Sequence, residues 1–330
     1  MASKKFLGID TSNYKTSVAL CDMEGNIVGD ERKLLKVKEG ERGLRQSDAL
    51  FQHVENLPVL LKKLFEGADS GEVAGICVSS KPRPVEGSYM PCFNAGLSTA
   101  GSLAAALKVP LWLTSHQEGH IAAAGAGRKE EFLPDHFLAF HLSGGTCELL
   151  DVSGAITNIG GSLDISFGQL LDRTGVALGM AFPAGEEMDR IALEASKSDF
   201  KRVLTRVKVS DSSFNLSGIE TQVLRKTAEL LAGGKDKGSA EAANLITEVF
   251  EKIAETASSA VFQAFEKTGA DTALLVGGVS SSAFLRERLQ KLFGEKRKNL
   301  IFGEPAYSSD NAAGVALIGR EHYLMEKING

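Results

Sequence analysis

The 330-residue sequence predicts an α/β fold built from two similar lobes. The first observation is an internal repeat, because residues 6–28 and residues 137–156 each read as strand, small-residue loop, strand, turn and strand. The second is that helices and further short strands follow each copy of the repeat. The third is a content of 35 glycines and only 8 prolines, which fits glycine-rich loops between well-formed elements. A duplicated fold of this kind has a cleft between its halves.

The remaining elements follow from hydrophobic periodicity. Apolar residues at helical spacing predict helices over residues 47–65, 94–107, 168–178, 241–267, 282–292 and 310–325. Apolar runs predict strands over residues 73–79, 111–114, 273–276 and 299–302. Residues 196–237 are polar and read as irregular. We therefore expect lobes at residues 1–135 and 136–330, a helical insertion near 184–240, and a last helix, 310–326, that packs back toward the first lobe.

Composition narrows the functional classes. The formal net charge is −5, and no stretch is basic enough to indicate nucleic acid, so an RNA partner would need a helper subunit. The four cysteines lack CxxC spacing and predict neither a zinc knuckle nor a disulfide framework. Residues 1–5 lead directly into a predicted strand, and no apolar run reaches the roughly 18 residues of a membrane span. We expect no signal peptide and no membrane contact, and a cytoplasmic location.

Two histidines four residues apart, His116 and His120, are the first candidates for chemistry. On a helix that Thr114 or Ser115 could cap, this spacing places both rings on one face. Two imidazoles so placed can chelate one metal ion, although the same pair also fits two ordinary polar residues on an exposed turn. Asp310, at the start of the predicted last helix, is the candidate for an oxygen ligand. Histidine and carboxylate ligands suit Fe, Zn or Mn.

The loops of the two repeat copies are candidates for binding nucleotide phosphates. Each loop joins two strands, and glycines in the second allow main-chain N–H groups to approach a phosphate closely. A plain hairpin turn is the alternative, but the repetition makes the phosphate interpretation more specific. The candidate residues in these loops are Thr11, Ser12, Ser143, Gly144 and Gly145.

Two further segments could contact a nucleotide. Gly277, Gly278 and Ser282 lie where a strand passes through a double glycine into a helix, whose N-terminal N–H groups carry partial positive charge. A helix cap with tight strand–helix packing explains the same residues equally well. Asp172 could bind ribose hydroxyls, with Gly185 allowing close approach of the main chain, although Asp172 also fits a surface helix position.

The loop 81–91 is rich in proline, charge and aromatic residues and follows a predicted buried strand. Functional loops often occupy this position in open α/β folds. Arg83 could bind a carboxylate or a phosphate. A solvated connection is the alternative interpretation.

Taken together, these motifs resemble the TsaD family, whose members complete threonylcarbamoyladenosine on tRNA and were formerly labelled O-sialoglycoprotein endopeptidases or peptidase family M22. The resemblance extends over nearly the whole chain, in the order of the family's motifs. The matching segments are Gly8–Ser12 (GIETS), Ser115–His120 (HHxEGH), Leu142–Gly145 (VSGG), Gly161–Thr174 (GES…AFDK), Pro183–Gly185 (PGG), Gly277–Arg286 (GGV…LR) and Ser309–Asn311 (TDN).

The resemblance implies a duplicated actin-like/sugar-kinase (ASKHA) fold of two lobes with a nucleotide cleft between them. It implies one divalent metal held by His116, His120 and Asp310. It also implies an adenine nucleotide of the ATP or AMP type, bound by Ser143, Gly144, Gly145, Gly168, Asp172, Gly185 and the turn Gly277–Ser282. In the family, the metal polarises the carbamoyl group of a carbamoyl-adenylate while an amine attacks and AMP leaves.

The sequence departs from the family's pattern near the acyl group and the acceptor. Where the family has a histidine after SGG, this chain continues with Thr146-Cys147. Where the family has an asparagine after GGV, this chain has Ser282. Asn13-Tyr14-Lys15 replaces an acidic pair, and residues 81–91 replace a glycine-rich GPGL loop. The pattern indicates a divergent paralogue that keeps the metal and phosphate positions. The candidates for contacts to the transferred group are Asp10, Arg83, Ser88 and Tyr89.

The resulting hypothesis is a metal-dependent carbamoyltransferase that moves a threonylcarbamoyl-like group from an AMP-activated donor to an amine, such as tRNA adenosine. One alternative is a non-catalytic nucleotide-binding scaffold of a TsaD-like complex, although such a protein has no need of the metal residues. Another is a metallopeptidase, although Gln117 stands where a zincin has its general-base glutamate, and Glu118 is one residue late. A TsaB-like protein or a second copy of the chain is the expected partner.

Overall fold

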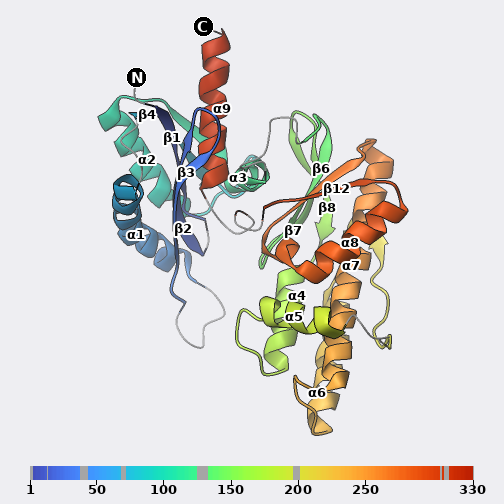
Figure 1. Cartoon of the computed structure of the whole chain (residues 1–330). Helices are drawn as coiled ribbons and strands as arrows, with labels where there is room; N and C mark the ends of the chain where they lie inside the picture. Colours follow the sequence, from blue (N-terminus) through green and yellow to red (C-terminus); the bar gives the residue numbers. More distant parts are fainter. Residues whose placement is uncertain are drawn as a thin grey trace. The chain divides into compact units, whose positions relative to one another are not determined.

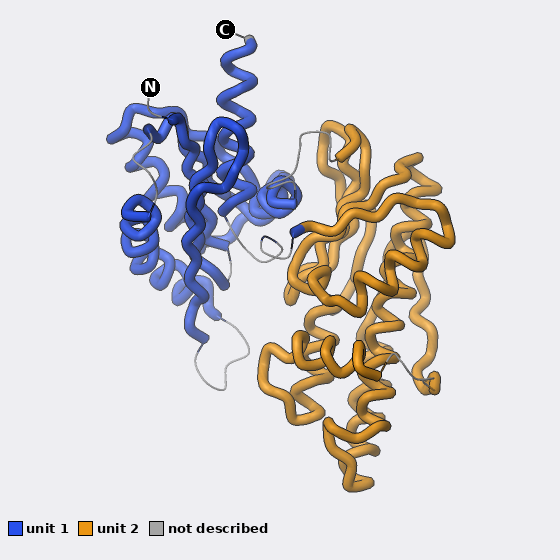
Figure 2. Tube along the Cα trace, in the orientation of Figure 1, with its two compact units in different colours: residues 1–132, 304–330 blue, residues 133–303 orange. Residues whose placement is uncertain are grey.

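The structure is a computed structural model that describes residues 3–12, 14–37, 44–67, 72–124, 133–195, 201–304, 307 and 312–329. The chain forms two compact units (Figure 2). Unit 1 comprises residues 1–132 and 304–330, and unit 2 comprises residues 133–303. The last helix therefore belongs to unit 1, although its sequence follows that of unit 2.

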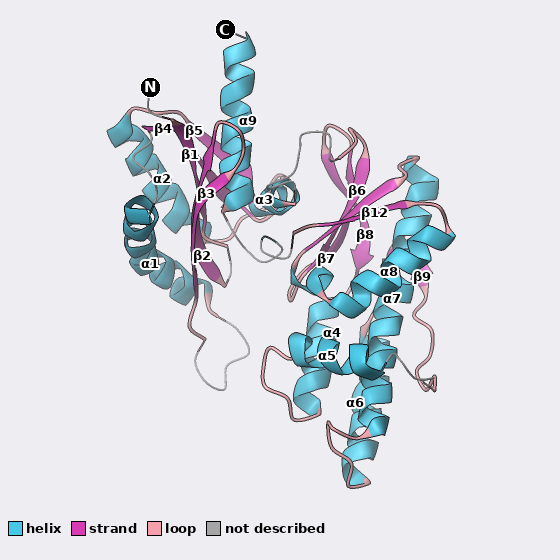
Figure 3. Cartoon of the chain, viewed as in Figure 1, coloured by secondary structure: helices cyan, strands magenta, loops and turns pink. Residues whose placement is uncertain are grey.

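Unit 1 contains a five-stranded sheet in the order β3-β2-β1-β4-β5, in which β1, β2 and β3 are antiparallel and β4 and β5 run parallel to β1 (Figure 3). Helices α1 and α2 pack on one face, and α9 packs on the other. The helix α3 packs against α9. The bounds are β1 Lys4–Asp10, β2 Lys15–Asp22, β3 Ile27–Leu34, α1 Gln46–Gly67, β4 Glu72–Lys81, α2 Phe93–Leu107, β5 Leu111–Ser115, α3 His116–Ala123 and α9 Ala313–Asn329.

The central strand β1 is buried on both faces, as its nearly continuous apolar sequence requires. Leu7 and Ile9 belong to the core beneath α1 and α2, whereas Phe6 packs with Ala316 of α9. At Gly8 a Cβ atom would lie 2.3 Å from the carbonyl oxygen of Ala312. Glycine at this position therefore lets α9 lie directly on the strand.

Unit 2 repeats this topology. Its seven-stranded sheet has the order β12-β11-β6-β7-β8-β10-β9, so β8-β7-β6-β11-β12 reproduces β3-β2-β1-β4-β5 of unit 1 (Figure 1). The duplication predicted from the repeat is therefore confirmed. The bounds are β6 Phe137–Leu142, β7 Cys147–Val152, β8 Ile156–Ser162, α4 Phe167–Ala177, α5 Gly185–Ala195, β9 Val209–Ser210, β10 Ser213–Phe214, α6 Ser217–Ala232, α7 Ala240–Thr268, β11 Thr272–Val276, a 3₁₀ turn Gly278–Ser281, α8 Ala283–Glu295 and β12 Asn299–Phe302.

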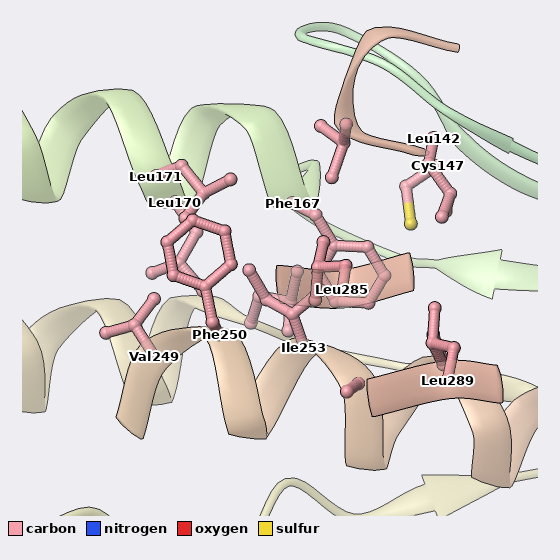
Figure 4. Packing of buried hydrophobic residues seen from close by; sticks show 14 of the residues in the cluster. Leu142, Cys147, Phe167, Leu170, Leu171, Val249, Phe250, Ile253, Leu285 and Leu289 are labelled. Atoms are coloured by element: carbon pink, nitrogen blue, oxygen red, sulfur yellow. The ribbon is translucent and has the colours of Figure 1, made fainter. Parts of the chain in front are cut away.

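The core of unit 2 joins α4, α7 and α8 to strands β6 and β7 (Figure 4). Phe167, at the start of α4, is fully buried there and stacks on Phe214 of β10 with ring centroids 5.2 Å apart. Six of the side chains labelled in Figure 4 come from two helices: Phe167, Leu170 and Leu171 from α4, and Val249, Phe250 and Ile253 from α7. This core fixes the start of α4, which carries several of the predicted site residues.

The prediction that residues 196–237 are irregular was wrong for part of that range. Residues 217–232 form the helix α6, whose Ile219 and Val223 are buried against the core of unit 2. The helices and strands predicted elsewhere are present, with ends shifted by a few residues. Over the described residues, no helix is both long and apolar enough to cross a membrane.

Candidate active site

Helix α3 begins at His116 because its N-terminus is closed by a capping box. The Ser115 hydroxyl accepts a hydrogen bond from the Glu118 main-chain N–H at 3.2 Å, and the Glu118 carboxylate accepts from the Ser115 N–H at 2.7 Å. The hydroxyl of Thr114 also donates to Glu118, at 3.1 Å. Ser115 is therefore the N-cap residue of α3, and the Glu118 carboxylate is hydrogen-bonded at the N-terminus of this helix.

The helix places His116 and His120 on one face, as their spacing predicts. Their Nε2 atoms lie 3.0 Å apart, and the ring centroids are 4.4 Å apart. His120 is buried, with 4% of its surface exposed, and His116 is half-buried. An arrangement with two ring nitrogens turned toward each other is unlike a pair of solvated surface histidines.

The histidine pair fits a transition-metal ion. Metal–nitrogen bonds of about 2.0–2.1 Å place two neighbouring nitrogen ligands about 3 Å apart, which is the spacing between the two Nε2 atoms. Asp310, the predicted third ligand, lies outside the described residues. Within the described ranges, no three side chains among His, Cys, Asp and Glu come together as a metal-binding group.

The position of α3 depends on a close crossing with α9. A Cβ atom at Gly314, in the first turn of α9, would lie 1.9 Å from the carbonyl oxygen of Gly119. A Cβ atom at Gly119 would in turn contact Val315 at 3.1 Å. The two helices can therefore approach at this distance only because position 314 is glycine, and glycine at position 119 avoids a tight contact with Val315.

Asp10, predicted to contact the transferred group, lies at the end of β1 directly behind His116. Its Oδ1 is 3.1 Å from Nδ1 of His116 and also accepts a hydrogen bond from the hydroxyl of Ser79. Its Oδ2 accepts from the Ser12 hydroxyl at 2.6 Å. Burial raises the pKa of the Asp10 carboxyl, but the His116 ring and the two serine hydroxyls outweigh it, so the pKa is lowered overall.

Thr11 and Ser12, predicted to bind nucleotide, are both buried within unit 1. The Thr11 hydroxyl donates to the carbonyl of Cys92 at 3.1 Å and accepts from the N–H of Gly96 at 3.2 Å. These bonds tie the end of β1 to the start of α2. Both hydroxyls are used inside the unit, so a role for either side chain at a phosphate stays a prediction.

The loop that follows β4 begins beside the histidine helix, since the carbonyl of Pro82 accepts from the main-chain N–H of Gln117 at 3.1 Å. Within the loop, the Ser88 hydroxyl accepts from the Arg83 main-chain N–H at 3.0 Å. Arg83 and Tyr89 are exposed, and the Tyr89 hydroxyl accepts from Asn94 at 3.2 Å. Arg83, Ser88 and Tyr89 are therefore on one loop that follows β4 and begins beside α3, and their contact with a transferred group stays a prediction.

The loop between β6 and β7 in unit 2 is organised by Ser143. Its hydroxyl accepts from the N–H groups of Gly145 and Thr146, at 3.3 and 2.8 Å. Gly144 and Gly145 are exposed, and a Cβ atom at either position would meet no atom within 4 Å. The loop thus presents bare main chain to open space, as a phosphate-binding loop requires.

The start of helix α4 packs against this loop. The Ser166 hydroxyl, which caps α4, also donates to the carbonyl of Gly144 at 2.8 Å. A Cβ atom at Gly168 would lie 2.5 Å from the Cα atom of Gly144, so only glycine allows this contact. Gly168 therefore acts by supporting the loop.

Asp172 connects α4 to the start of α5. Its Oδ1 accepts from the N–H of Ala184 at 2.9 Å, and a hydrogen bond from Gly185 also reaches its carboxylate. Burial raises the pKa of Asp172, partly offset by these two N–H donors. The half-buried carboxylate thus fixes the first turn of α5, and its contact with a ribose stays a prediction.

The turn from Gly277 to Ser282 passes between β6 and α5. Gly277 has φ +95°, and a Cβ atom there would lie 2.3 Å from the carbonyl oxygen of Leu142. At the other end of the turn, the hydroxyl of Ser282 donates to Asp189 of α5 and caps α8 through the N–H of Leu285. Gly278 between them is exposed and faces open space.

These contacts form a closed ring around the C-terminal ends of β6 and β11. The ring runs from the loop at Ser143 through Gly168 and Asp172 to Gly185, then through Asp189 to Ser282 and back to β6. Parallel strands of open α/β sheets bind ligands outside their C-terminal ends. The structure therefore brings together all the predicted nucleotide residues of unit 2.

Sequence reasoning missed three residues that hold this site. Ser79 donates to Asp10, Ser166 supports Gly144, and Asp189 caps α8. Ser166 could have been found from the capping box that it forms with Gln169, three residues later. Ser79 and Asp189 carry no such local signal, because their partners lie 69 and 93 residues away.

Two curated proteins are similar over nearly the whole chain. The tRNA N6-adenosine threonylcarbamoyltransferase of Neorickettsia sennetsu is 28% identical over 319 residues, which cover 96% of this chain and 93% of that protein. The protein of the same name from Aromatoleum aromaticum is 27% identical over 320 residues, covering 96% and 90%.

Solved structures share the fold at low sequence identity. HypF of T. kodakarensis has a TM-score of 0.61 at 12% identity, covering 98% of this chain and 48% of that one. Component A of the (R)-2-hydroxyglutaryl-CoA dehydratase of Acidaminococcus fermentans has a TM-score of 0.55 at 15% identity, covering 97% and 99%. A ROK family glucokinase of Streptomyces griseus has a TM-score of 0.53 at 12% identity, covering 96% and 99%. The actin-like/sugar-kinase fold is therefore confirmed.

The family model described as "TsaD: tRNA N6-adenosine threonylcarbamoyltransferase" matches residues 34–317. This range includes the histidine helix, the loop at Ser143 and the turn at Gly277. The chain therefore belongs to the TsaD family and is a transferase of that family.

Proposed function

We propose that the protein is a metal-dependent carbamoyltransferase of the TsaD type. It would move a threonylcarbamoyl-like group from an AMP-activated donor to an amine, with tRNA adenosine as the first acceptor to test. The single observation that carries this proposal is the facing pair His116 and His120, with Nε2 atoms 3.0 Å apart on a capped helix. The curated relatives, whose names state this activity, support the choice of substrate class.

His116, His120 and Asp310 would hold the metal, which we expect to be Fe, Zn or Mn. Asp310 stands three residues before α9, whose first turn packs against α3 through Gly314. The bound metal would supply Lewis-acid polarisation of the carbamoyl oxygen. The chain's own part is to fix both imidazoles, through the α3 cap and the crossing with α9.

The ring in unit 2 would bind the adenine nucleotide. Its support is the bare main chain at Gly144, Gly145 and Gly278, which faces open space at the C-terminal ends of two parallel strands. Proteins of the same fold are described with nucleotides, including the glucokinase with AMPPNP and HypF in its phosphate- and nucleotide-bound form. The N–H groups of Ser143, Gly145 and Thr146 are bonded within the loop, so the N–H of Gly144 would be its donor to a phosphate.

The alternatives receive less support from the geometry. A metallopeptidase needs a glutamate free to act as general base, but Glu118 accepts three hydrogen bonds from Ser115 and Thr114 in the helix cap. A non-catalytic scaffold has no use for two histidines whose ring nitrogens face each other.

The test is to measure metal content and the turnover of carbamoyl-adenylate in the purified full chain, with tRNA as acceptor. We expect the variants His116→Ala, His120→Ala and Asp310→Ala to lose both metal and turnover. His136→Ala, at the surface of unit 2, is the matched control and is expected to keep both. The proposal is wrong if the three site variants retain metal and turnover at the level of the control.

We also infer that a second copy of the chain pairs with the outer face of α1. One apolar side of this helix is buried in the core of unit 1. A second apolar side faces solvent, and its Phe51, Val54 and Phe65 are 63%, 55% and 44% exposed. With the exposed Pro58, they recur at spacings of three, four and seven residues, so they share one side of the helix. A helix that is apolar on two sides is normally covered on both.

Charge and area both fit a two-fold pair. Glu55 and Lys62 lie along one edge of this apolar stripe, Glu55 before Pro58 and Lys62 after it. A two-fold axis near Pro58 would therefore place Glu55 of one copy beside Lys62 of the other. The 22 residues of α1 span about 33 Å, and α1 with its neighbour α2 is about 20 Å wide. Such a face approaches the roughly 800 Å² that each partner buries in a standard interface.

A further inference from the structure

We propose that Asp10 is a positioning residue that sets the orientation and the tautomer of His116, so that Nε2 of His116 faces the metal. This inference rests on the proposed function, because it assigns His116 as a metal ligand. It differs from the earlier expectation that Asp10 contacts the transferred group.

The carboxylate of Asp10 is held from three elements. Ser79 of β4 donates to its Oδ1, Ser12 in the loop after β1 donates to its Oδ2 at 2.6 Å, and His116 of α3 lies 3.1 Å from Oδ1. Asp10 has no exposed surface. A buried carboxylate with both oxygens hydrogen-bonded to the protein is fixed in place, and three of its roughly four acceptor sites are already used here.

The fixed carboxylate determines where the proton of His116 lies. Both Asp10 oxygens can only accept, so the Nδ1 atom of His116, 3.1 Å away, carries the proton and donates it. The other nitrogen, Nε2, then holds a lone pair directed at Nε2 of His120, 3.0 Å away. Metal-binding histidines commonly use a carboxylate in this way to fix the ring and its tautomer.

A purely structural role for Asp10 predicts something different. In that case the carboxylate serves to join the ends of β1 and β4 through Ser79, and its loss would lower stability without selecting a tautomer of His116. The two roles can be separated by observing the His116 ring itself in the metal-free protein.

The first measurement is the 15N NMR spectrum of the histidine side chains in the metal-free full chain at fixed pH. We expect the Nδ1–H tautomer for His116 in the wild type and a mixture of tautomers in Asp10→Ala. The second is the affinity for Mn²⁺, read from the EPR signal of the free ion. We expect a 10–100-fold weaker affinity in Asp10→Ala and a smaller loss in Asp10→Asn, whose amide oxygen can still accept from His116.

Ser17→Ala is the matched control, because the Ser17 hydroxyl contacts the main-chain carbonyl of Asp10 at 3.4 Å and not its carboxylate. It should keep both the tautomer and the affinity. The inference is overturned if wild-type His116 carries its proton on Nε2, or if a folded Asp10→Ala binds Mn²⁺ as tightly as the control. If Asp10→Ala fails to fold, the wild-type spectrum and Asp10→Asn decide. A wild type that binds no metal overturns the proposed function as well, whereas equal affinities in wild type and variant overturn only the role of Asp10.

Discussion

Asp189 of α5 and Ser282 at the start of α8 are joined by a hydrogen bond from the serine hydroxyl to the carboxylate. The same carboxylate accepts from the N–H groups of Ala283 and Phe284, at 2.9 and 3.2 Å. An acidic side chain of the protein itself therefore occupies the positive N-terminus of α8. This supports the helix-cap interpretation of that segment and leaves the glycines before it as the part that can approach a ligand.

Asp189→Ala is expected to destabilise unit 2, because it leaves several N–H and O–H donors at α8 without their acceptor. The expected loss is about 1–3 kcal/mol in the free energy of unfolding, measured by urea denaturation. Nucleotide affinity should fall as well, since Asp189 closes the ring at the turn Gly278–Ser281. Glu186→Ala, an exposed position in the first turn of α5, is the control. Equal stability of the two variants would contradict the capping role.

The sequence predicted what is local. The repeat, the helix spacing of His116 and His120 and the glycine loops are each readable within a short window, and all are present in the structure. The contact between Asp10 and His116 could not be predicted from the sequence, because the two residues are 106 positions apart and no spacing rule relates the end of a strand to a distant helix. What Asp10 touches is decided by the order of β1, β4 and β5 in the sheet.

Helix α6 was not predicted from the sequence, for a different reason. Its buried face consists of Ile219, Val223 and Thr227, spaced by four residues, but one of the three is polar. The stripe is therefore narrow, and the surrounding polar residues obscure it. Packing against α7 and α4 makes this segment helical, which is a tertiary effect that composition does not reveal.

The buried His53 on α1 is expected to make stability depend on pH. Burial lowers its pKa to about 4 from the ordinary 6.5, although the charge of Asp10 partly offsets this. The unfolded chain therefore binds more protons than the native chain between pH 6.5 and 4, so stability is full above 6.5 and is lost as the pH falls. The loss from this group is about 2 kcal/mol at pH 5.

The check is to compare urea unfolding of the wild type and His53→Gln at pH 7 and pH 5. The Nδ1 atom of His53 lies 2.8 Å from the Thr16 hydroxyl, and glutamine can replace this contact without titrating. The variant should therefore lose about 2 kcal/mol less than the wild type over this interval. Parallel pH dependence in the two proteins would rule out His53 as the source.

The outer face of α1 gives a prediction about assembly. Val54→Glu places a charge in the middle of the exposed stripe and should raise the dimer dissociation constant at least 10-fold, measured by analytical ultracentrifugation of the full chain. Leu163→Glu, at a 68% exposed position in unit 2, is the matched control. Glu55→Lys and Lys62→Glu should each weaken the dimer, and the double variant should restore it. A monomeric wild type at about 50 μM, or a dimer unaffected by Val54→Glu, would contradict the pairing.

Glycines at the nucleotide ring separate support of the loop from contact with the ligand. In Gly168→Ala the new Cβ atom would lie 2.5 Å from the main chain of Gly144, so the loop or α4 must move. We expect a loss of about 1–3 kcal/mol in stability and at least a 10-fold loss in ATP affinity by calorimetry. In Gly144→Ala the Cβ atom meets no protein atom within 4 Å, so stability should stay unchanged while ATP affinity falls. Gly294→Ala, in the last turn of α8, also meets no atom within 4 Å, so it should leave ATP affinity unchanged and, as a glycine replaced within a helix, raise stability by about 0.5–1 kcal/mol. If Gly144→Ala binds ATP as tightly as Gly294→Ala does, the nucleotide does not lie against this loop.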